Sequence, residues 1–509
     1  MLRKFEGFGR PEASNEGEKA EKIERKEQPE EKKETTPRSE ERRSEREASP
    51  ESKEKNLEST LGLLQATRLP KERMGGIIPV SPEDRKILRT EVEHSLKNLD
   101  ACYQSNFGIF PTGDPDDNFY NTLWLRDLAH AGGNFFAENN DTAVIDSLET
   151  AFLYQKEDGS LPYRIERKYF LAEHVVRALS GFKLSWLKKI GIDLVTRKRE
   201  KPIYEGEQGG NADDTIPTVT ITTGELFIHS SKGRDFIKSR FGSIEKAMQQ
   251  FLSRTDPADG LEISRMSNPD WADSLIRGGK KISTVNIWQA RALQMMRFMS
   301  TSLDRPDRAA FYGERYLKVK NGIMEKLYDA EHHYFRSAEG ESRIDAAASI
   351  FGSLYILPVQ EAVKVEETMD AYLRSNSGLR NFYPPYPKNR VYPILRLIGM
   401  GGYHNKGVWP WLTAQNIQVK IRIALEHEDT AIREQYKKEA VEDLVDVAKL
   451  FEDAGGAYEV FDPDTRKPAT WLRTLLRRYE MPKNLMGNLA AFQSAYHQLK
   501  KLGWLEDEA

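Results

Sequence analysis

Apolar residues recur at spacings of three and four positions along most of the chain beyond residue 80. Such spacing places them on one face of an α-helix, as Tyr316, Ile323 and Leu327 do in the stretch 306–329. Period-two alternation, which is typical of strands, is confined to short runs such as Val219-Thr-Ile-Thr222 and Tyr458-Glu-Val-Phe461. We predict helices at 83–99, 124–139, 142–156, 214–228, 235–254, 285–302, 306–329, 344–355, 359–374, 408–427, 429–452 and 484–501.

The predicted helices are of two kinds that alternate along the chain. Long and strongly charged amphipathic helices, such as 306–329 and 429–452, suit an outer layer that faces water. Helices with less charge, such as 285–302 and 408–427, follow loops rich in Gly, Pro, Trp and Asp and suit an inner layer. Twelve helices in alternating inner and outer rings form an all-α (α/α)6 barrel. In such a barrel, the loops that enter the inner helices gather at one end and form a pocket.

Two stretches stand outside the alternation. Residues 1–60 consist mostly of Glu, Lys, Arg, Ser, Pro and Thr, so they cannot bury enough apolar surface to offset the entropy of ordering. We predict a disordered tail of mixed charge there, and a barrel domain over residues 80–509. Residues 164–206 contain one amphipathic helix, at about 168–189, and then a basic run, which we interpret as a helical insertion beside the pocket. We expect this insertion to form a surface helical hairpin, and part of a lid or a subunit contact are the alternatives.

Composition narrows the classes of function. The net charge of −3 gives no sign of a nucleic-acid partner. The single cysteine, Cys102, rules out an intramolecular disulfide and is typical of a reducing compartment. No apolar run approaches the roughly 18 residues that cross a bilayer, and the N-terminus has no apolar core like that of a signal peptide. We expect a cytoplasmic protein without a membrane partner, and the oligomeric state stays open.

Metal and cofactor chemistry has no motif in this chain. The histidines and the cysteine lack the paired spacing of a zinc site, and no Gly-rich loop for nucleotide phosphates occurs. The run Asp114-Pro-Asp-Asp-Asn118 lacks the Gly and the Glu that a calcium-binding EF-hand loop requires. We therefore expect no metal and no cofactor.

Two carboxylates stand in similar settings far apart in the sequence. Asp273 follows Asn268-Pro-Asp-Trp-Ala272, and Glu459 follows Gly455-Gly-Ala-Tyr458. Two carboxyl groups that face one another across a pocket are the minimum equipment for hydrolysing a glycosidic bond. Trp271 would lower the polarity around Asp273 and raise the pKa of its carboxyl, as a general acid that works near neutral pH requires. The alternatives are Asp270 as the acid or as a cap, and Glu459 on a hairpin that faces solvent.

Other loops combine aromatic rings with polar groups suited to a sugar. One loop carries Trp124, Arg126 and Asp127. An indole stacks on the C–H face of a sugar, while Arg and Asp can share two neighbouring hydroxyls. The alternative is that Asp127 caps a helix beside a surface Arg. Asp214 opens a predicted inner helix, where Asp213 or Asp214 either caps the helix or contacts substrate.

The segment Tyr403-His-Asn-Lys-Gly-Val-Trp-Pro-Trp411 has a similar composition. Trp409 and Trp411 flank a proline suited to a helix start, so we expect one indole to pack in the core and the other to face the pocket. His404 is a candidate for substrate binding, although a histidine in such a place is more often a hydrogen-bonded structural residue than a catalyst.

Taken together, these segments resemble the (α/α)6-barrel glycoside hydrolases over roughly residues 85–504. They are similar to the catalytic domains of glycogen-debranching amylo-α-1,6-glucosidases and to the neutral/alkaline invertases of glycoside hydrolase family 100. The matching segments are Trp124-Leu-Arg-Asp127 for the terminal sugar, Asp270-Trp-Ala-Asp-Ser274 for the acid, Thr284-Val-Asn-Ile-Trp288 for a substrate-facing amide, Gly407-Val-Trp-Pro-Trp411 for the Trp-Pro element and Tyr458-Glu-Val-Phe-Asp-Pro463 for the base. The chain departs from the invertases at Asp273-Ser-Leu-Ile276, where they have Asp-Arg-Arg-Met.

The resemblance implies an inverting, exo-acting glycoside hydrolase that acts on α-glucosides. Asp273 is then the acid, Glu459 the base and Asn286 the amide that faces the substrate. Two alternatives stay open. The first is a phosphorylase on the same fold, with Arg466 or Lys467 supplying a cation near Glu459. The second is a non-catalytic carbohydrate-binding or scaffold protein.

Overall fold

The structure of the protein is a computed structural model. It describes residues 76–113, 122–129, 133–166, 200–205, 212–264, 270–397, 399–473 and 478–506. The chain divides into two units, Met1–Pro50 and Glu51–Ala509, and all described residues belong to the second. The predicted tail at 1–60 lies outside the described residues. The predicted helix at 168–189 also lies outside them. Of the insertion at 164–206, only residues 164–166 and 200–205 are described.

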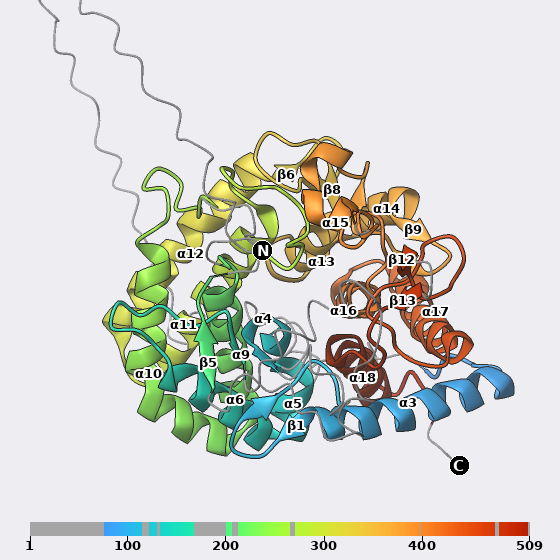
Figure 1. The fold of residues 1–509 in the computed structure, drawn as a ribbon, viewed down its shortest axis with the longest axis horizontal. Coiled ribbons are helices and arrows are strands. Elements are labelled where there is room, and N and C mark those ends of the chain that lie inside the picture. Colours follow the sequence, from blue (N-terminus) through green and yellow to red (C-terminus); the bar gives the residue numbers. More distant parts are fainter. Residues whose placement is uncertain are drawn as a thin grey trace, which may run out of the picture. The chain divides into compact units, whose positions relative to one another are not determined.

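Six helices form an inner ring in this second unit. They are α5 (Gly133–Asn139), α9 (Thr215–His229), α11 (Ser283–Ser302), α13 (Ala346–Tyr355), α16 (Pro410–Glu426) and α18 (Met486–Lys501). Each helix contacts the next in this order, and α18 contacts α5, so that the ring closes (Figure 1). Nearly every residue of α11 and α16 is buried, which explains why these helices carry so little charge.

Six further helices cover the inner ring. They are α3 (Pro82–Cys102), α6 (Asp141–Leu153), α10 (Ser231–Leu252), α12 (Pro306–Lys326), α14 (Val359–Tyr372) and α17 (Thr430–Ala454). Each packs on one or two inner helices: α12 lies on α11, for example, and α17 on α16 and α18. Only one stripe of each outer helix is buried. This arrangement confirms the predicted (α/α)6 barrel.

Local sequence determines where several of these helices begin and end. The side chains of Ser81, Asn140, Ser230 and Asp345 each accept a hydrogen bond from a backbone N–H in the first turn of the helix that follows. Helix α17 ends at Gly455, whose φ of 72° lies in the left-handed region that glycine adopts without strain. No described helix is long and apolar enough to cross a membrane.

The predicted helix at 124–139 is wrong in its first half. Thr122–Trp124 forms strand β3, Leu125–Asp127 forms the short helix α4, and α5 begins only at Gly133. Strand β3 pairs with β4 (Arg164–Glu166), which in turn pairs with β5 (Lys201–Ile203). Local periodicity could not reveal these partners, because they lie at the two ends of the insertion, about 40 or more residues along the chain.

The run Val219-Thr-Ile-Thr222 lies inside α9, in agreement with the helix predicted at 214–228, despite its period-two alternation. The hydroxyls of Thr218, Thr220, Thr222 and Thr223 each donate to the carbonyl four residues earlier. This pairing lets threonines occupy a buried helix without leaving a polar group unsatisfied. The second period-two run, at Tyr458, makes only two isolated bridges, in which Phe461 pairs with Val408 and with Pro468.

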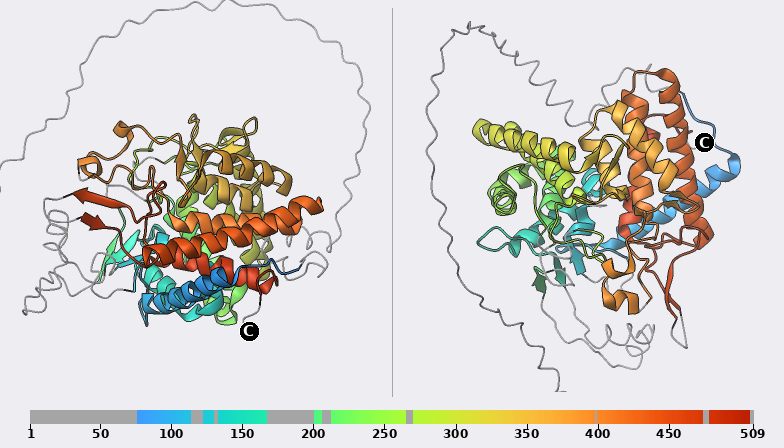
Figure 2. Two further views of the ribbon diagram at one scale, coloured as in Figure 1. Left: turned by 90° about the vertical axis from the view of Figure 1, so that its right-hand side faces the viewer. Right: turned by 90° about the horizontal axis from the view of Figure 1, so that it is seen from above.

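The remaining strands are short antiparallel pairs in the connecting loops. They are β1 (Tyr103–Gln104) with β2 (Gly108–Ile109), β6 (Tyr328–Asp329) with β7 (Tyr334–Phe335), β8 (Ile344–Asp345) with β11 (Phe382–Tyr383), β9 (Arg374–Ser375) with β10 (Gly378–Leu379), and β12 (Thr470–Arg473) with β13 (Arg478–Glu480). Figure 2 shows β3–β5, β12–β13 and the short helix α15 (Pro393–Leu397) at the same end of the barrel helices. The loops therefore gather at that end, as the fold requires.

A buried ionic group lies between helices α14, α16 and α17. Glu366 of α14 is fully buried, and its Oε2 accepts a hydrogen bond of 2.9 Å from the amide of Asn416. Lys420 of α16 is also buried and lies 3.0 Å from a carboxylate oxygen of Glu439 and 2.9 Å from one of Asp443, both on α17. Burial raises the pKa of Glu366 to about 8, although the Lys420 charge opposes the shift.

We expect the Glu366→Gln variant to gain stability relative to wild type as pH rises. In the unfolded chain, this carboxyl ionises near its ordinary pKa, whereas the folded protein keeps the proton until about pH 8. Unfolding therefore releases a proton in this window, and the wild type should lose roughly 1.4 kcal/mol per pH unit that the variant does not lose.

Urea denaturation of both proteins at pH 5.5, 7 and 8.5 measures this difference. The matched control is Glu442→Gln, which removes an exposed carboxylate of α17. A difference between the Glu366 variant and wild type that does not change with pH would contradict the assignment.

Candidate active site

Three side chains from other parts of the fold contact the carboxylate of Asp273, which lies in the loop before α11. Arg126 donates through Nη1 to Oδ2 at 3.2 Å, and the hydroxyl of Tyr163 donates to Oδ2 at 3.4 Å. The Nδ1 atom of His404 lies 3.6 Å from Oδ1. The side chain of Asp273 keeps 25% of its surface exposed, so a substrate can reach the carboxyl.

Asp270 is committed to holding this loop. It is fully buried, and it accepts hydrogen bonds from the backbone N–H two residues further on and from the hydroxyl of Thr284 at the start of α11. It also forms a buried ion pair with Arg277, whose Nη1 lies 3.8 Å from Oδ2 of Asp345, the N-cap of α13. The loop is thereby tied to two inner helices. Of the two candidate acids, the structure leaves Asp273 as the accessible one.

Arg126 links helix α4 to helix α9. Its Nε lies 2.7 Å from Oδ2 of Asp214, and its Nη2 donates to Oδ1 at 3.2 Å. Both side chains are buried, and burial raises the pKa of Asp214 to about 7 against the opposing charge of the arginine. Neither aspartate caps α9 with its side chain, since Asp213 instead pairs with Arg254 at 2.7 Å. Arg126 therefore holds Asp214 and Asp273 together.

The rest of the Trp124 loop lies around this arginine. The ring of Trp124 meets that of Tyr163 edge-on at 5.1 Å, and the guanidinium of Arg164 lies 4.8 Å above the indole. Trp124 is half-buried, which leaves part of its face accessible. Burial raises the pKa of the neighbouring Asp127 to about 7, with Arg126 opposing the shift. Asp127 can therefore exchange a proton near neutral pH.

Glu459 is buried rather than exposed on a hairpin, with only 5% of its surface accessible. The hydroxyl of Tyr403 donates a hydrogen bond of 2.7 Å to its Oε1. Its backbone is fixed as well, because its N–H donates to the carbonyl of Pro482 at 2.9 Å. The amide of Asn488, on α18, donates to the preceding carbonyl, that of Tyr458, at 2.8 Å. The carboxylate is therefore held in one position.

Trp271, Trp409 and Trp411 form an aromatic cluster with His404. Trp271 meets His404, Trp409 and Trp411 edge-on, at 5.5, 5.7 and 5.3 Å between ring centres. All four rings are buried, and the expectation that one of Trp409 and Trp411 faces the pocket stays a prediction. Asn286 is fully buried too, and its amide bonds to the backbone at Glu262 and Ile282.

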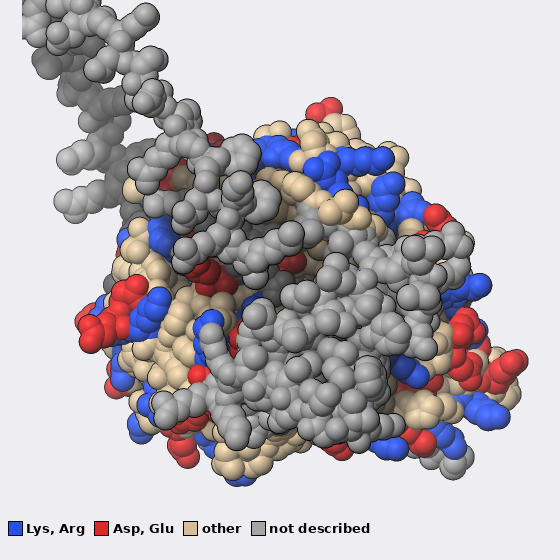
Figure 3. All heavy atoms as spheres, in the orientation of Figure 1, with Lys and Arg blue, Asp and Glu red and all other residues tan. Residues whose placement is uncertain are grey.

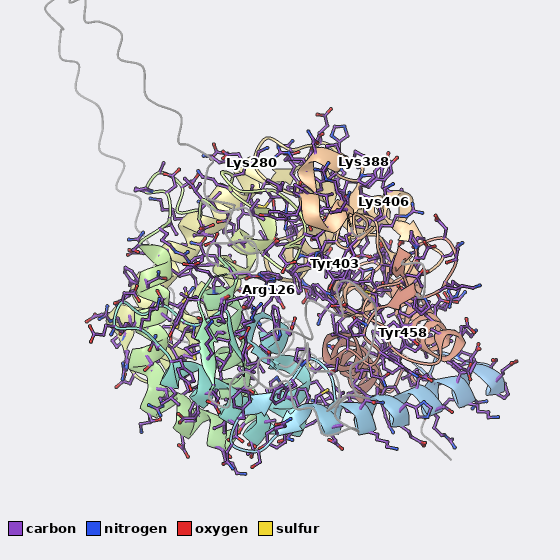
Figure 4. The ribbon with its side chains drawn as sticks, in the orientation of Figure 1. Arg126, Lys280, Lys388, Tyr403, Lys406 and Tyr458 are labelled. Atoms are coloured by element: carbon purple, nitrogen blue, oxygen red, sulfur yellow. The ribbon has the colours of Figure 1, made fainter. Side chains whose placement is uncertain are left out.

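The structure brings the two carboxylates to one site in the barrel. Asp273 contacts His404, and Glu459 contacts the adjacent Tyr403. In the view of Figure 4, Arg126 and Tyr403 both lie toward the middle of the ring of helices. Sequence reasoning assigned no role to Tyr163 or Tyr403. Tyr403 lay in a segment already singled out, whereas nothing in the local pattern around Tyr163 marks it.

The fold is shared with known glycosidase structures. The chain is similar to a rhamnosidase from Klebsiella oxytoca with rhamnose bound, at 13% identity and a TM-score of 0.55, over 84% of this chain and 66% of that one. It is also similar to a GH63 mannosylglycerate hydrolase from Thermus thermophilus in complex with glucose, at 13% identity and a TM-score of 0.53, over 80% and 99%. A wild-type glycosidase matches at 13% identity and a TM-score of 0.52, over 84% and 100%.

At this identity the likeness establishes the six-hairpin glycosidase fold. The chain spans just under two thirds of the rhamnosidase's length and essentially all of the other two proteins. No protein-family model matches the sequence. The narrower resemblance to amylo-α-1,6-glucosidases and family 100 invertases stays a prediction.

We expect the Arg126→Gln variant to lose about 3–5 kcal/mol of unfolding free energy, because it leaves a buried carboxylate without its cation. The loss should grow as pH rises above about 7. Asp214 then has to ionise unpaired in the folded protein, whereas it is ionised throughout in the unfolded chain.

Urea denaturation at pH 6 and pH 8.5 tests this. The control, Asp214→Asn, keeps the shape of the side chain and removes its titration, so its loss should not steepen with pH. Equal losses for Arg126→Gln at both pH values would show that the pair does not titrate as described.

Proposed function

We propose that this protein is an inverting, exo-acting glycoside hydrolase, with Asp273 as the general acid and Glu459 as the general base. The observation that carries the proposal is the convergence of these two carboxylates, 186 positions apart in the sequence, on the adjacent residues His404 and Tyr403. Their position inside a six-hairpin glycosidase barrel supports the same chemistry.

In the proposed reaction, Asp273 donates its proton to the glycosidic oxygen as the bond to the anomeric carbon breaks. Water attacks this carbon from the opposite face and gives a proton to Glu459, so the product has inverted configuration. Inverting enzymes hold the two carboxyl groups about 6.5–9.5 Å apart to admit the water. The proton passes from Glu459 to solvent, and Asp273 takes one up before the next turnover.

The charge around Asp273 depends on Arg126, on Asp214 and on the protonation of His404. Arg126 favours the ionised carboxylate, but it shares its charge with Asp214. Burial lowers the pKa of His404 well below its ordinary value, and the charges of Arg126 and Arg277 lower it further. His404 is therefore neutral and adds no positive charge beside the acid.

We assign the substrate class by resemblance as an α-glucoside, an oligosaccharide or a small glycoside. The partly exposed Trp124 supplies a surface for the sugar, and Asp127 supplies a group that accepts or donates a hydrogen bond to a hydroxyl. Arg126 contributes through the position of Asp273. Trp271 and Trp409 pack against the ring of His404, and Trp411 packs against Trp271. No metal is part of the mechanism we propose.

We expect Asp273→Asn and Glu459→Gln each to reduce kcat by at least about 100-fold without unfolding the protein, since general acid–base catalysis contributes roughly 10²–10⁴. The assay is release of sugar from aryl α-glycosides and small disaccharides, with the product anomer followed by NMR. The control is Asp453→Asn, an exposed carboxylate of α17, which should retain wild-type activity.

Near-wild-type rates in either purified catalytic variant would refute the assignment. A product that retains its configuration would refute inversion. Product formation that depends on phosphate would favour phosphorolysis. Phosphorolysis would require a cation near Glu459, and Arg466 was a candidate from the sequence. In the structure, Arg466 pairs with Asp446 and Asp453 on the outer helix α17.

A second candidate substrate is a sugar joined to a small acid. Residues 371–425 contain eight basic side chains and no Asp or Glu. Part of this stretch lies against the loop of the acid, because the N–H of Ile276 donates to the carbonyl of Arg390 at 2.7 Å and that of Tyr392 to Ser274 at 3.2 Å. One of the similar structures is a mannosylglycerate hydrolase.

Two of the basic side chains of this region are exposed, although Lys420 is buried. Lys388 and Lys406 are exposed, and neither forms an ion pair within the described part of the chain. Figure 3 shows Lys and Arg gathered on this part of the face, where Figure 4 labels Lys280, Lys388 and Lys406. A carboxylate on the leaving group would therefore meet a positive field near Asp273.

We expect Lys388→Glu and Lys406→Glu to raise KM for a glycosyl glycerate by roughly threefold or more and to leave KM for a neutral disaccharide unchanged. The added negative charge repels only the anionic substrate, and salt should weaken the effect. Lys438→Glu, on the exposed face of α17, is the control. Equal effects on both substrates would contradict the anionic assignment.

A further inference from the structure

We propose that Tyr403 and His404 are positioning residues that together fix the distance between the acid and the base. The proposal rests on the function proposed above. Each of the two adjacent residues contacts one carboxylate: Tyr403 contacts Glu459, and His404 contacts Asp273 and the residue after it. The separation of two groups that are far apart in the sequence then depends on one short piece of backbone.

The contact that Tyr403 makes with Glu459, which we call the Tyr403 arm, reaches the proposed base, and the contact that His404 makes with the loop of Asp273 is the His404 arm. Its hydroxyl donates to Oε1 of Glu459 at 2.7 Å, a charge-assisted hydrogen bond when the carboxylate is ionised. The ring is held from two sides, by His404 at 4.3 Å and by Trp409 at 5.1 Å between ring centres. The indole N–H of Trp409 also donates to the Tyr403 carbonyl at 3.1 Å. Ring and backbone of Tyr403 therefore have little freedom to move.

The His404 arm ends on the loop of the acid. Its Nδ1 accepts a hydrogen bond of 3.2 Å from the N–H of Ser274, so the proton of the neutral ring lies on Nε2. The ring stacks on Trp409, with 4.8 Å between centres and 12° between planes. Its backbone carbonyl accepts from the amide of Asn381 at 2.9 Å. His404 thus fixes the peptide unit next to Asp273.

Gly407 allows the loop that carries Tyr403 and His404 to pack closely against the segment that carries Glu459. A Cβ atom at this position would overlap the Val460 side chain, next to the base, and would lie 2.8 Å from the Tyr403 carbonyl. The loop is further closed by hydrogen bonds from the N–H groups of Lys406 and Gly407 to the carbonyl of Gly402, both at 2.9 Å. The two arms and the base therefore form one packed unit.

Different contacts are described at the two carboxylates, and these are what a titration of the variants can probe. Asp273 faces Arg126, Tyr163 and His404, with Asp127 acting on it electrostatically. Glu459 faces the hydroxyl of Tyr403. A change at Tyr403 should therefore reach the titration of the base and leave that of the acid unchanged.

The Tyr403→Phe variant tests the first arm. Loss of the hydrogen bond disfavours the ionised base, so the acidic limb of the kcat/KM profile should move to higher pH by about one unit, while the alkaline limb stays in place. We expect kcat to fall roughly tenfold and KM to change little. Tyr383→Phe, an exposed tyrosine, is the control and should match wild type.

A profile with both limbs unchanged in Tyr403→Phe, or with only the alkaline limb moved, would overturn the proposal. This outcome is distinct from failure of the proposed function. If Glu459→Gln is inactive and Tyr403→Phe titrates like wild type, the hydrolase stands and the positioning role is refuted.

The second arm is tested by rescue. His404→Asn places an amide oxygen near the position of Nδ1 and can still accept from Ser274, whereas His404→Leu cannot. We expect the Asn variant to keep kcat within about fivefold of wild type and the Leu variant to lose at least about 50-fold. Thermal unfolding checks that both variants fold. Equal kcat values in two folded variants would refute the role of the acceptor.

Discussion

The site depends on one buried guanidinium, that of Arg126. It extends from α4, bonds twice to Asp214 at the start of α9 and once to Asp273 in the loop before α11. Two acidic groups so close together in a buried place would repel one another without a cation between them. The arginine makes their common position possible and brings two neighbouring inner helices and the strand β3 to one point.

The fold was largely predictable because its signal is repeated along the chain. All twelve predicted helices have a counterpart, and the difference in charge between the two kinds corresponds to the inner and outer rings. The error at 124–139 has a physical cause. Its first half contains strand β3, which depends on a partner that follows it by about 40 residues, and this pairing is not encoded in local spacing. The threonines of α9 alternate like a strand, but they fit the helix predicted at 214–228 because their hydroxyls bond to their own helix.

The residues of the candidate site could be singled out from the sequence, but their contacts could not. The neighbours of Asp273 and Glu459 marked them as candidates, and both contact the Tyr403-His404 pair, while their catalytic roles stay a proposal. The sequence could not show that Arg126 would be buried against Asp214, or that Asn286 would use its amide on the backbone. Such pairings depend on which side chains the barrel brings together, and an aromatic residue in a loop gives no sign of whether it faces a cavity or the core.

The attachment of both arms to adjacent residues has a consequence for how the protein tolerates heat and motion. Consecutive Cα atoms are held about 3.8 Å apart by covalent geometry, which does not change as the temperature rises. Helices that slide or tilt against one another by a fraction of an ångström would carry the ends of a widely spaced pair apart. An acid and a base that are both held by Tyr403 and His404 would instead move together. The separation that the proposed reaction requires for its water would then persist through thermal fluctuations of the barrel.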